Sequence, residues 1–289
     1  MGDADPPTEP PAPSRDLATS APVIGDTRPI TASSIRPGDG RRACDIALDG
    51  TVAGRHHVAA ASLVGLAHTV TGTSRQDAYG FCLDQRGRLY VAVADGLGSR
   101  PVSQLGARIL CDEIMRIACE YDDDSPAAPA ALIATAGRHT AQLTRDVYGL
   151  NPRDAGCVAI VGSFGPDRYE FARVGDPTAF TLAEASFVEL FDHHSDFVNL
   201  VDATIPEDAE RATTVTMTSA TSVIALVTDG LATDIRNSER VRAWLMNQWA
   251  TPTTAYAMGE SLRYRRQGSH DDRTAVVIWT PRGNSGTDM

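Results

Sequence analysis

Three acidic clusters in this sequence stand where a run of apolar residues begins or ends. They are Asp95-Gly96 after "LYVAVA", Asp229-Gly230 after "SVIALVT", and Asp271-Asp272 before "RTAVVIW". A strand buried on both faces delivers its last side chain to the end of its sheet, where a carboxylate can face a cleft instead of the core. Carboxylates gathered in this way can hold a divalent cation, and oxygen ligands without cysteine or paired histidine favour Mg²⁺ or Mn²⁺ over zinc.

The alternative interpretation is that each aspartate only opens a turn. The sequence contains four Asp-Gly pairs, and those at residues 39–40 and 49–50 lie in a polar stretch where they are turn formers. One strand ending of this kind favours the turn, whereas three similar endings favour a shared site. Like charges held close together raise one another's pKa, and a divalent cation is the natural compensation.

The composition excludes several classes of function. A net charge of −11 argues against a nucleic-acid or anionic-membrane partner, since both attract basic surfaces. The sequence contains no run of about 18 apolar residues, so it predicts no membrane span. Five cysteines without a C-x-x-C pair indicate neither a disulfide framework nor a zinc site. The first residues do not form a secretory leader, so we expect a cytoplasmic protein.

The chain divides by texture into a tail and a globular part. Residues 1–55 hold eight of the 17 prolines and no sustained apolar period, which predicts a disordered tail. Residues 56–282 are expected to form one domain, and residues 283–289 a flexible C-terminus.

The domain is predicted to combine eight short strands with four helices. The strands are "AYGFCLD", "RLYVAVAD", "CVAIVGSF", "RYEFARVGD", "AFTLAE", "ASFVELF", "SVIALVTD" and "RTAVVIWT". The helices cover residues 103–120 with Ser103 as a cap, residues 130–148, a segment after Ser238 and a segment after Thr251-Pro252. Several strands lie close enough for hairpins, and the helices come in two pairs. We therefore expect an α+β fold, a four-layer α-β-β-α sandwich of two antiparallel sheets flanked by helix pairs.

Six motifs in order resemble those of metal-dependent serine/threonine phosphatases of type 2C. They are "QDAYG…LYVAVADGLGS…GA", "GCVAIV", "ARVGDPTAFTL", "LFDHHSDFVN", "VIALVTDGL" and "HDDRTAVV". The match is best to a bacterial branch with "G-x-x-H…QDA" and "DGxGS", and it covers roughly residues 60–280. The resemblance implies a sandwich of two antiparallel sheets with two Mn²⁺ or Mg²⁺ ions at one end.

The resemblance also implies a set of metal ligands. Asp95 would bridge both ions, the Gly96 carbonyl would bind one, and Asp229 and Asp271 would complete the other. Asp271 and Asp272 cannot be separated by sequence alone, and the family register favours Asp271.

Further residues are implied around these ligands. Asp77 would hold metal-bound water, and Asp176 matches a position that can help to hold a third, weaker ion. Gly72 stands where many family members place a phosphate-binding arginine. His68 and Arg75 are the candidates to bind the phosphate in its place, and His68 is the better one; it could also protonate the leaving group.

The implied reaction is hydrolysis of phosphoserine and phosphothreonine in proteins by a metal-bridging hydroxide. The expected partners are phosphorylated proteins and a cognate serine/threonine kinase, with no nucleic acid or membrane. The missing arginine motivates a rival interpretation, an inactive pseudophosphatase that binds phosphoproteins. A phosphatase of small phosphoesters is a third interpretation.

Overall fold

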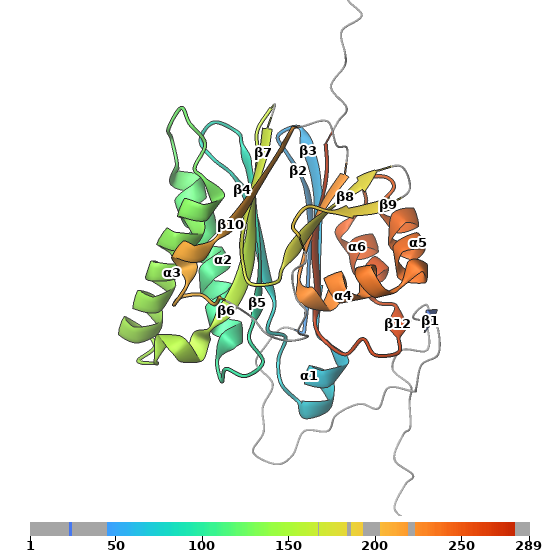
Figure 1. The fold of residues 1–289 in the computed structure, drawn as a ribbon, viewed down its shortest axis with the longest axis horizontal. Helices are drawn as coiled ribbons and strands as arrows, with labels where there is room; N and C mark the ends of the chain where they lie inside the picture. The colour runs from blue at the N-terminus through green and yellow to red at the C-terminus, as the bar shows by residue number, and fades with distance from the viewer. Residues whose placement is uncertain are drawn as a thin grey trace, which may run out of the picture.

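Two antiparallel sheets lie face to face, and helices cover the outer side of each (Figure 1). The computed structural model describes residues 23–24, 45–166, 168–183, 186–192, 203–218 and 223–280. The expected α+β class with two antiparallel sheets between helices is confirmed. Most of the predicted tail and the predicted C-terminal segment lie outside the described residues, as do His193 and His194 of the fourth motif.

The first sheet has five strands in the order β10-β7-β6-β5-β4. Their bounds are Ala78–Leu83 for β4, Leu89–Gly96 for β5, Cys157–Phe164 for β6, Arg168–Val174 for β7 and Thr213–Thr218 for β10. The helices α2 (Ser103–Glu120) and α3 (Pro129–Asp146) pack on its outer face through an apolar cluster that both helices share with β5 and β6. The expectation of a helix pair on this side is confirmed.

The second sheet has six strands in the order β2-β3-β13-β11-β8-β9. Their bounds are Ile46–Ala53 for β2, His56–Leu63 for β3, Thr178–Ala183 for β8, Ser186–Glu189 for β9, Val223–Val227 for β11 and Arg273–Trp279 for β13. Three helices cover it: α4 (Asp229–Asn237), α5 (Glu239–Gln248) and α6 (Ala255–Leu262). The short strands β1 (Val23–Ile24) and β12 (Arg265–Arg266) pair in parallel beside them.

Alternate side chains of β5 pack into two different apolar layers. Leu89, Val91 and Val93 belong to the core between the sheets. Tyr90 and Ala92 face the other way and pack under α2 and α3. Side chains of a strand point alternately to opposite faces, so a strand between two apolar layers reads as the continuous apolar run seen in the sequence.

Several elements differ from the sequence-based expectation. The strand β2 lies within the predicted tail and pairs along its whole length with β3, so the sheet begins at Ile46 and not after residue 55. Asp229 does not end a strand but begins α4, a helix that the prediction lacked. Val102 and not Ser103 caps α2, and α6 begins at Ala255 with Thr254 as its cap.

Three short helical elements connect the strands and the longer helices. The helix α1 (Leu66–Thr71) projects beyond one end of the sandwich (Figure 1). Short 3-10 turns occupy Pro152–Ala155 and Ala209–Arg211. Within the described part of the chain, no helix is both long and apolar enough to cross a membrane.

Candidate metal centre

The predicted aspartates come from both sheets and meet at one end of the sandwich. Asp95 is at the end of β5 in the five-stranded sheet, and Asp77 immediately precedes β4 in the same sheet. Asp229 is the first residue of α4, and Asp271 lies two residues before β13. Asp176 lies in the turn between β7 and β8. The strands β5 and β13, next to Asp95 and Asp271, belong to different sheets, so the carboxylates converge across the two sheets.

Burial and mutual repulsion raise the pKa of Asp77, Asp95 and Asp229. The pKa of Asp95 lies well above its usual range because of burial, followed by the charges of Asp77 and Asp229. Burial and the nearby Asp272 raise the pKa of Asp77 to about 8. Burial, with the charges of Asp176 and Asp271, raises the pKa of Asp229 to about 6. The side chains of Asp95 and Asp229 also share a hydrogen bond.

This donor set fits a divalent cation. Carboxylates that raise one another's pKa hold concentrated negative charge, and an ion of charge +2 relieves that repulsion while it replaces the missing hydration. Both Asp95 and Asp229 keep partial access to solvent, so an ion can reach them. Their oxygen atoms are ligands that Mg²⁺ and Mn²⁺ prefer.

Glycines allow the segments of the site to pack backbone against backbone. A Cβ atom on Gly65 would lie 2.3 Å from the Asp271 carbonyl carbon, and one on Gly230 would lie 2.2 Å from the Asp272 carbonyl oxygen. A Cβ on Gly96 would lie 2.9 Å from the Gln76 carbonyl oxygen. Any side chain at these positions would push apart the loops that carry the aspartates.

Asp272 holds the loop around α1 against the start of β13. Its Oδ1 accepts hydrogen bonds from the Gly65 amide at 2.6 Å and from His68 Nδ1 at 2.9 Å. Its Oδ2 accepts from the Gln76 amide at 2.6 Å. The side chain is almost fully buried. The hydrogen bond to Asp272 is the main reason why the pKa of His68 is raised, against the opposing effect of burial.

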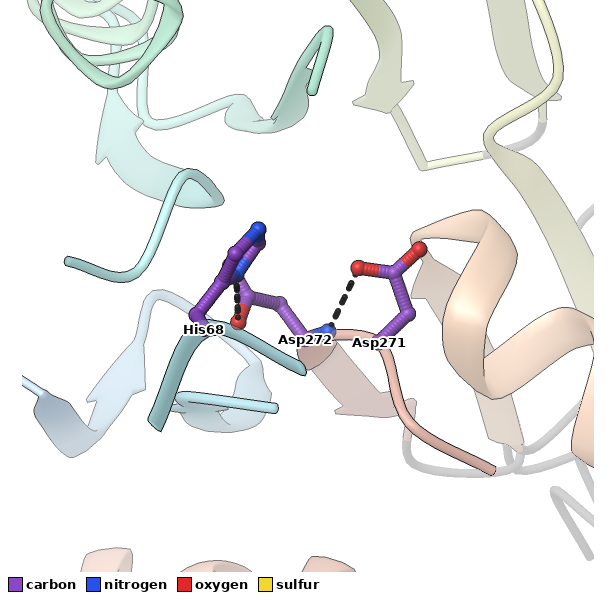
Figure 2. A group of neighbouring side chains, drawn as sticks. All are labelled: His68, Asp271 and Asp272. Atoms are coloured by element: carbon purple, nitrogen blue, oxygen red, sulfur yellow. Dashed lines mark hydrogen bonds and ion pairs between the residues drawn. The ribbon is translucent and has the colours of Figure 1, made fainter. Parts of the chain in front are cut away.

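The geometry distinguishes Asp271 from its neighbour. One ligand atom from each of His68, Asp271 and Asp272 lies within 4.8 Å of the other two. The Asp271 side chain is exposed, whereas both oxygens of Asp272 already accept N–H groups. In Figure 2 the His68 ring and the Asp271 carboxylate point to the same side of Asp272. This arrangement favours Asp271 as the residue that can turn its oxygens toward an ion.

A chain of hydroxyl groups fixes Asp77. Its Oδ2 accepts hydrogen bonds from Thr228 Oγ1 at 2.8 Å and from Thr274 Oγ1 at 2.6 Å. The Thr274 hydroxyl is 2.5 Å from Ser62 Oγ, which in turn accepts from an Arg75 guanidinium nitrogen at 2.5 Å. The same nitrogen donates to the Asp77 carbonyl oxygen at 2.5 Å. The donor chain runs from Arg75 through two hydroxyls to the Asp77 carboxylate.

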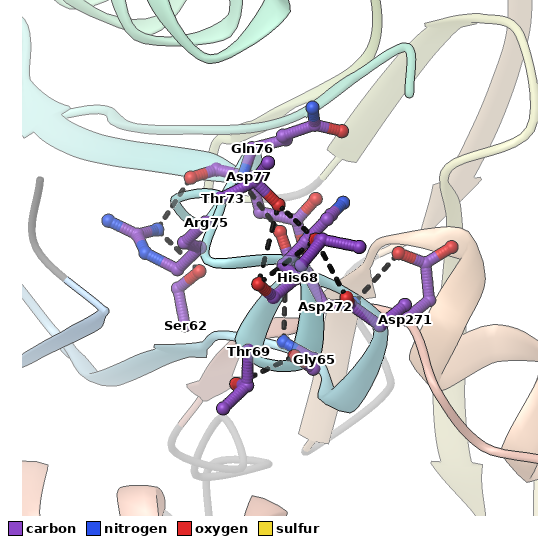
Figure 3. Close-up of polar contacts among 12 residues, drawn as sticks. Ser62, Gly65, His68, Thr69, Thr73, Arg75, Gln76, Asp77, Asp271 and Asp272 are labelled. Atoms are coloured by element: carbon purple, nitrogen blue, oxygen red, sulfur yellow. Dashed lines mark hydrogen bonds and ion pairs between the residues drawn. The ribbon is translucent and has the colours of Figure 1, made fainter. Parts of the chain in front are cut away.

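The structure distinguishes the two candidates for phosphate binding, His68 and Arg75. Arg75 contacts the backbone and hydroxyl groups behind Asp77, and Figure 3 shows its guanidinium pointing away from His68 and Asp271. The structure places His68, but not the Arg75 guanidinium, beside the carboxylates of Asp271 and Asp272. Gly72 caps the C-terminus of α1 with a φ of 73°, and a Cβ there would meet no atom within 4 Å.

Two arginine side chains near Asp176 were not predicted from the sequence. The charges of Arg236 and Arg173 both lower the pKa of Asp176, although burial has the larger effect and raises it. Arg236 belongs to α4 and also forms an ion pair with Glu189 at 2.5 Å. Arg173 precedes Asp176 by three residues at the end of β7, and this proximity along the chain was the one available signal.

Comparison with known proteins assigns the fold and the family. The sequence model described as protein phosphatase 2C matches residues 64–264. The chain belongs to the protein phosphatase 2C family. The match includes Asp77, Asp95, Asp176 and Asp229 and ends seven residues before Asp271. A search by sequence among curated proteins finds no significant match.

Solved structures of other members share the protein phosphatase 2C fold at low sequence identity. The serine/threonine phosphatase Stp1 from Staphylococcus aureus is 13% identical, with a TM-score of 0.61 over 83% of this chain and 98% of that one. PppA, a regulatory component of a secretion system in Pseudomonas aeruginosa, is 18% identical, with a TM-score of 0.56 over 78% and 97%. RsbX in complex with magnesium is 16% identical, with a TM-score of 0.55 over 81% and 99%. Family and fold together support a protein phosphatase function.

Proposed function

We propose that this protein hydrolyses phosphoserine and phosphothreonine in other proteins and that it requires Mn²⁺ or Mg²⁺. The observation that carries the proposal is the convergence of Asp77, Asp95, Asp229 and Asp271 from two sheets, where burial and the charges of neighbouring aspartates raise the pKa of Asp77, Asp95 and Asp229. A fold that only needed turns at these positions would have no reason to gather unneutralised carboxylates, because buried charge without a partner destabilises a protein.

The metal ligands of the proposal are Asp95, Asp229, Asp271 and the carbonyl of Gly96. Two ions would be held between the two sheets, and Asp176 would contribute to a third, weaker site. Ions bound there would neutralise charge on the phosphoryl group and acidify a water molecule that attacks phosphorus. Asp77 would accept a hydrogen bond from water in this site, since two threonine hydroxyls fix its carboxylate.

His68 supplies what the chain itself can add to phosphate binding. Its Nδ1 is bonded to Asp272, so its Nε2 is the ring nitrogen left for a phosphate oxygen or for the leaving alkoxide. Asp272 also raises the pKa of His68, which favours the protonated ring and a charge-assisted hydrogen bond to an anion. A guanidinium at position 72 would bind phosphate in a bidentate manner, so we expect weaker phosphate capture than in relatives with that arginine.

One observation favours a second candidate function, a pseudophosphatase that binds phosphoproteins without turnover. Neither Gly72 nor the Arg75 guanidinium offers a cation to the substrate phosphate, since Arg75 contacts Ser62 and the Asp77 carbonyl. The complete set of candidate ligands favours the active enzyme. The natural partners on either view are phosphorylated proteins in the cytoplasm and the serine/threonine kinase that phosphorylates them.

The experiment is hydrolysis of p-nitrophenyl phosphate and a phosphothreonine peptide with Mn²⁺, Mg²⁺ or EDTA. Wild type is compared with Asp95→Asn, and Asp84→Asn serves as a control that removes a buried carboxylate at the far end of β4. We expect metal-dependent hydrolysis of the peptide by wild type and the control, and none by Asp95→Asn. Mn²⁺ binding by wild type without turnover would favour the pseudophosphatase. Equal turnover in EDTA would refute the metal-dependent mechanism.

A further inference from the structure

A buried carboxylate outside the candidate metal centre contacts four polar side chains from residues 264–273. Asp234 lies in α4, and its side chain is 1% exposed. Its Oδ1 accepts a hydrogen bond from Arg266 at 2.7 Å. Its Oδ2 accepts from the Tyr264 hydroxyl at 2.6 Å and from the Ser269 hydroxyl at 2.7 Å. Arg273 completes the set with an ion pair of 3.2 Å.

The donors enclose the segment that carries Asp271. Ser269 and Arg273 stand on either side of residues 270–272, and Arg273 also donates to Ser269 Oγ at 2.6 Å. The second terminal nitrogen of the Arg273 guanidinium, Nη1, donates to two backbone carbonyls, those of Leu262 and Tyr264. Both ends of this three-residue segment are therefore held by contacts that converge on Asp234.

The helix α4 connects Asp234 to Asp229. Asp229 is the first residue of α4, and Asp234 follows it by five residues within the same nine-residue helix. Backbone hydrogen bonds fix the distance between these two positions along the helix. A contact between Asp234 and the loop therefore fixes Asp229 relative to Asp271, whose charges already act on one another.

We propose that Asp234 is a positioning residue that holds Asp229 and Asp271 at the separation that metal binding requires. This inference rests on the proposed function. Asp234 itself is not one of the proposed metal ligands. Its effect passes through α4 on one side and through the Ser269–Arg273 clamp on the other. Partners that orient metal ligands in this indirect way typically change metal affinity by about 10- to 100-fold when they are removed.

A matched buried ion pair separates positioning from stability. Asp84 is 0% exposed at its side chain and pairs with Arg88 at 2.6 Å, as Asp234 pairs with Arg266. It follows β4, whereas Asp77 precedes that strand, and seven residues of extended chain span about 23 Å. Asp84→Asn should therefore lower the thermal midpoint as Asp234→Asn does, but without reaching the metal centre.

The test is Mn²⁺ binding by calorimetry to metal-free wild type, Asp234→Asn and Asp84→Asn, with folding checked by circular dichroism. We expect the Kd for Mn²⁺ to rise about 10- to 100-fold in Asp234→Asn and to stay within about twofold of wild type in Asp84→Asn. If Asp234→Asn does not fold, Ser269→Ala is measured in its place, because it removes one hydrogen-bond donor to Asp234. The Kd of this variant for Mn²⁺ should rise several-fold.

The outcomes separate this inference from the proposed function. Tight Mn²⁺ binding by wild type and equally tight binding by a folded Asp234→Asn would overturn the inference alone. Unchanged binding by Ser269→Ala, where Asp234→Asn is unfolded, would overturn it in the same way. Absence of Mn²⁺ binding in wild type would overturn the proposed metal centre and the inference with it.

Discussion

Replacing Asp229 by asparagine should stabilise the metal-free protein and destabilise the metal-loaded one. The folded protein holds the Asp229 proton more tightly than the unfolded chain, since its pKa is about 6 instead of 3.8. Stability associated with this group is therefore present below pH 4 and is lost as the pH rises to about 6. A difference of about two pH units corresponds to about 3 kcal/mol in the free energy of unfolding. Asparagine cannot ionise, so the variant avoids this loss.

The effect of metal has the opposite sign. Wild type at 1,000 times its Kd for Mn²⁺ gains about 4.1 kcal/mol from binding, and the variant loses a ligand and most of that gain. We therefore expect Asp229→Asn to be more stable than wild type by up to about 3 kcal/mol in EDTA at pH 8. The two proteins should be about equal near pH 4, and their order should reverse at pH 8 with saturating Mn²⁺.

Urea unfolding followed by tryptophan fluorescence measures these differences, since Trp249 and Trp279 are buried in the fold. The series covers pH 4.5 to 8 in EDTA and is repeated in Mn²⁺. Asp84→Asn is the control, because it breaks the pair with Arg88 and should be less stable than wild type in both series. A stability difference between Asp229→Asn and wild type that does not change with pH in EDTA would refute the electrostatic reasoning.

Four further substitutions test other parts of the site. His68→Gln should lower kcat for the phosphothreonine peptide by about 100-fold or more, as expected for a lost proton donor, with the Kd for Mn²⁺ nearly unchanged by calorimetry. Arg75→Lys should lower the thermal midpoint and leave KM unchanged in steady-state kinetics; a rise in KM alone would restore Arg75 as a phosphate ligand. Gly65→Ala should cost about 1–3 kcal/mol and weaken Mn²⁺ binding, since its Cβ would lie 2.3 Å from Asp271. Gly72→Ala, with open space but a φ of 73°, should cost about 1 kcal/mol in urea unfolding without an effect on Mn²⁺.

The sequence was informative where apolar runs are long. The strands β5, β6, β11 and β13 are buried along nearly their whole length, so each appears as an unbroken apolar run with recognisable ends. The strand β10 was missed because "TTVTMT" lies at a sheet edge, where alternate side chains stay exposed and carry no apolar signal. The strand β2 was missed for the same reason, since it lies at an edge of the six-stranded sheet and most of its residues are partly or fully exposed.

The sequence pointed to the carboxylates of the candidate site but not to the contacts that hold them. Asp95 and Asp229 were visible as acidic endings of apolar runs, although the helix that Asp229 begins was not expected. The contacts of Asp272 join residues separated by 196 to 207 positions, so no local pattern could reveal them. Arg75 illustrates the limit, because its place two residues before Asp77 suggested the phosphate, whereas its hydrogen bonds lead to Ser62.

The position of β13 has a consequence for synthesis of the protein. This strand comes last among the described strands, yet it lies between β3 and β11 in the interior of its sheet. A ribosome-bound chain that ends before residue 271 lacks both an interior strand and a candidate ligand, and non-local pairings of this kind form late in folding. We expect nascent chains to remain without phosphatase activity until the last strand has emerged, so that turnover begins only with a finished domain.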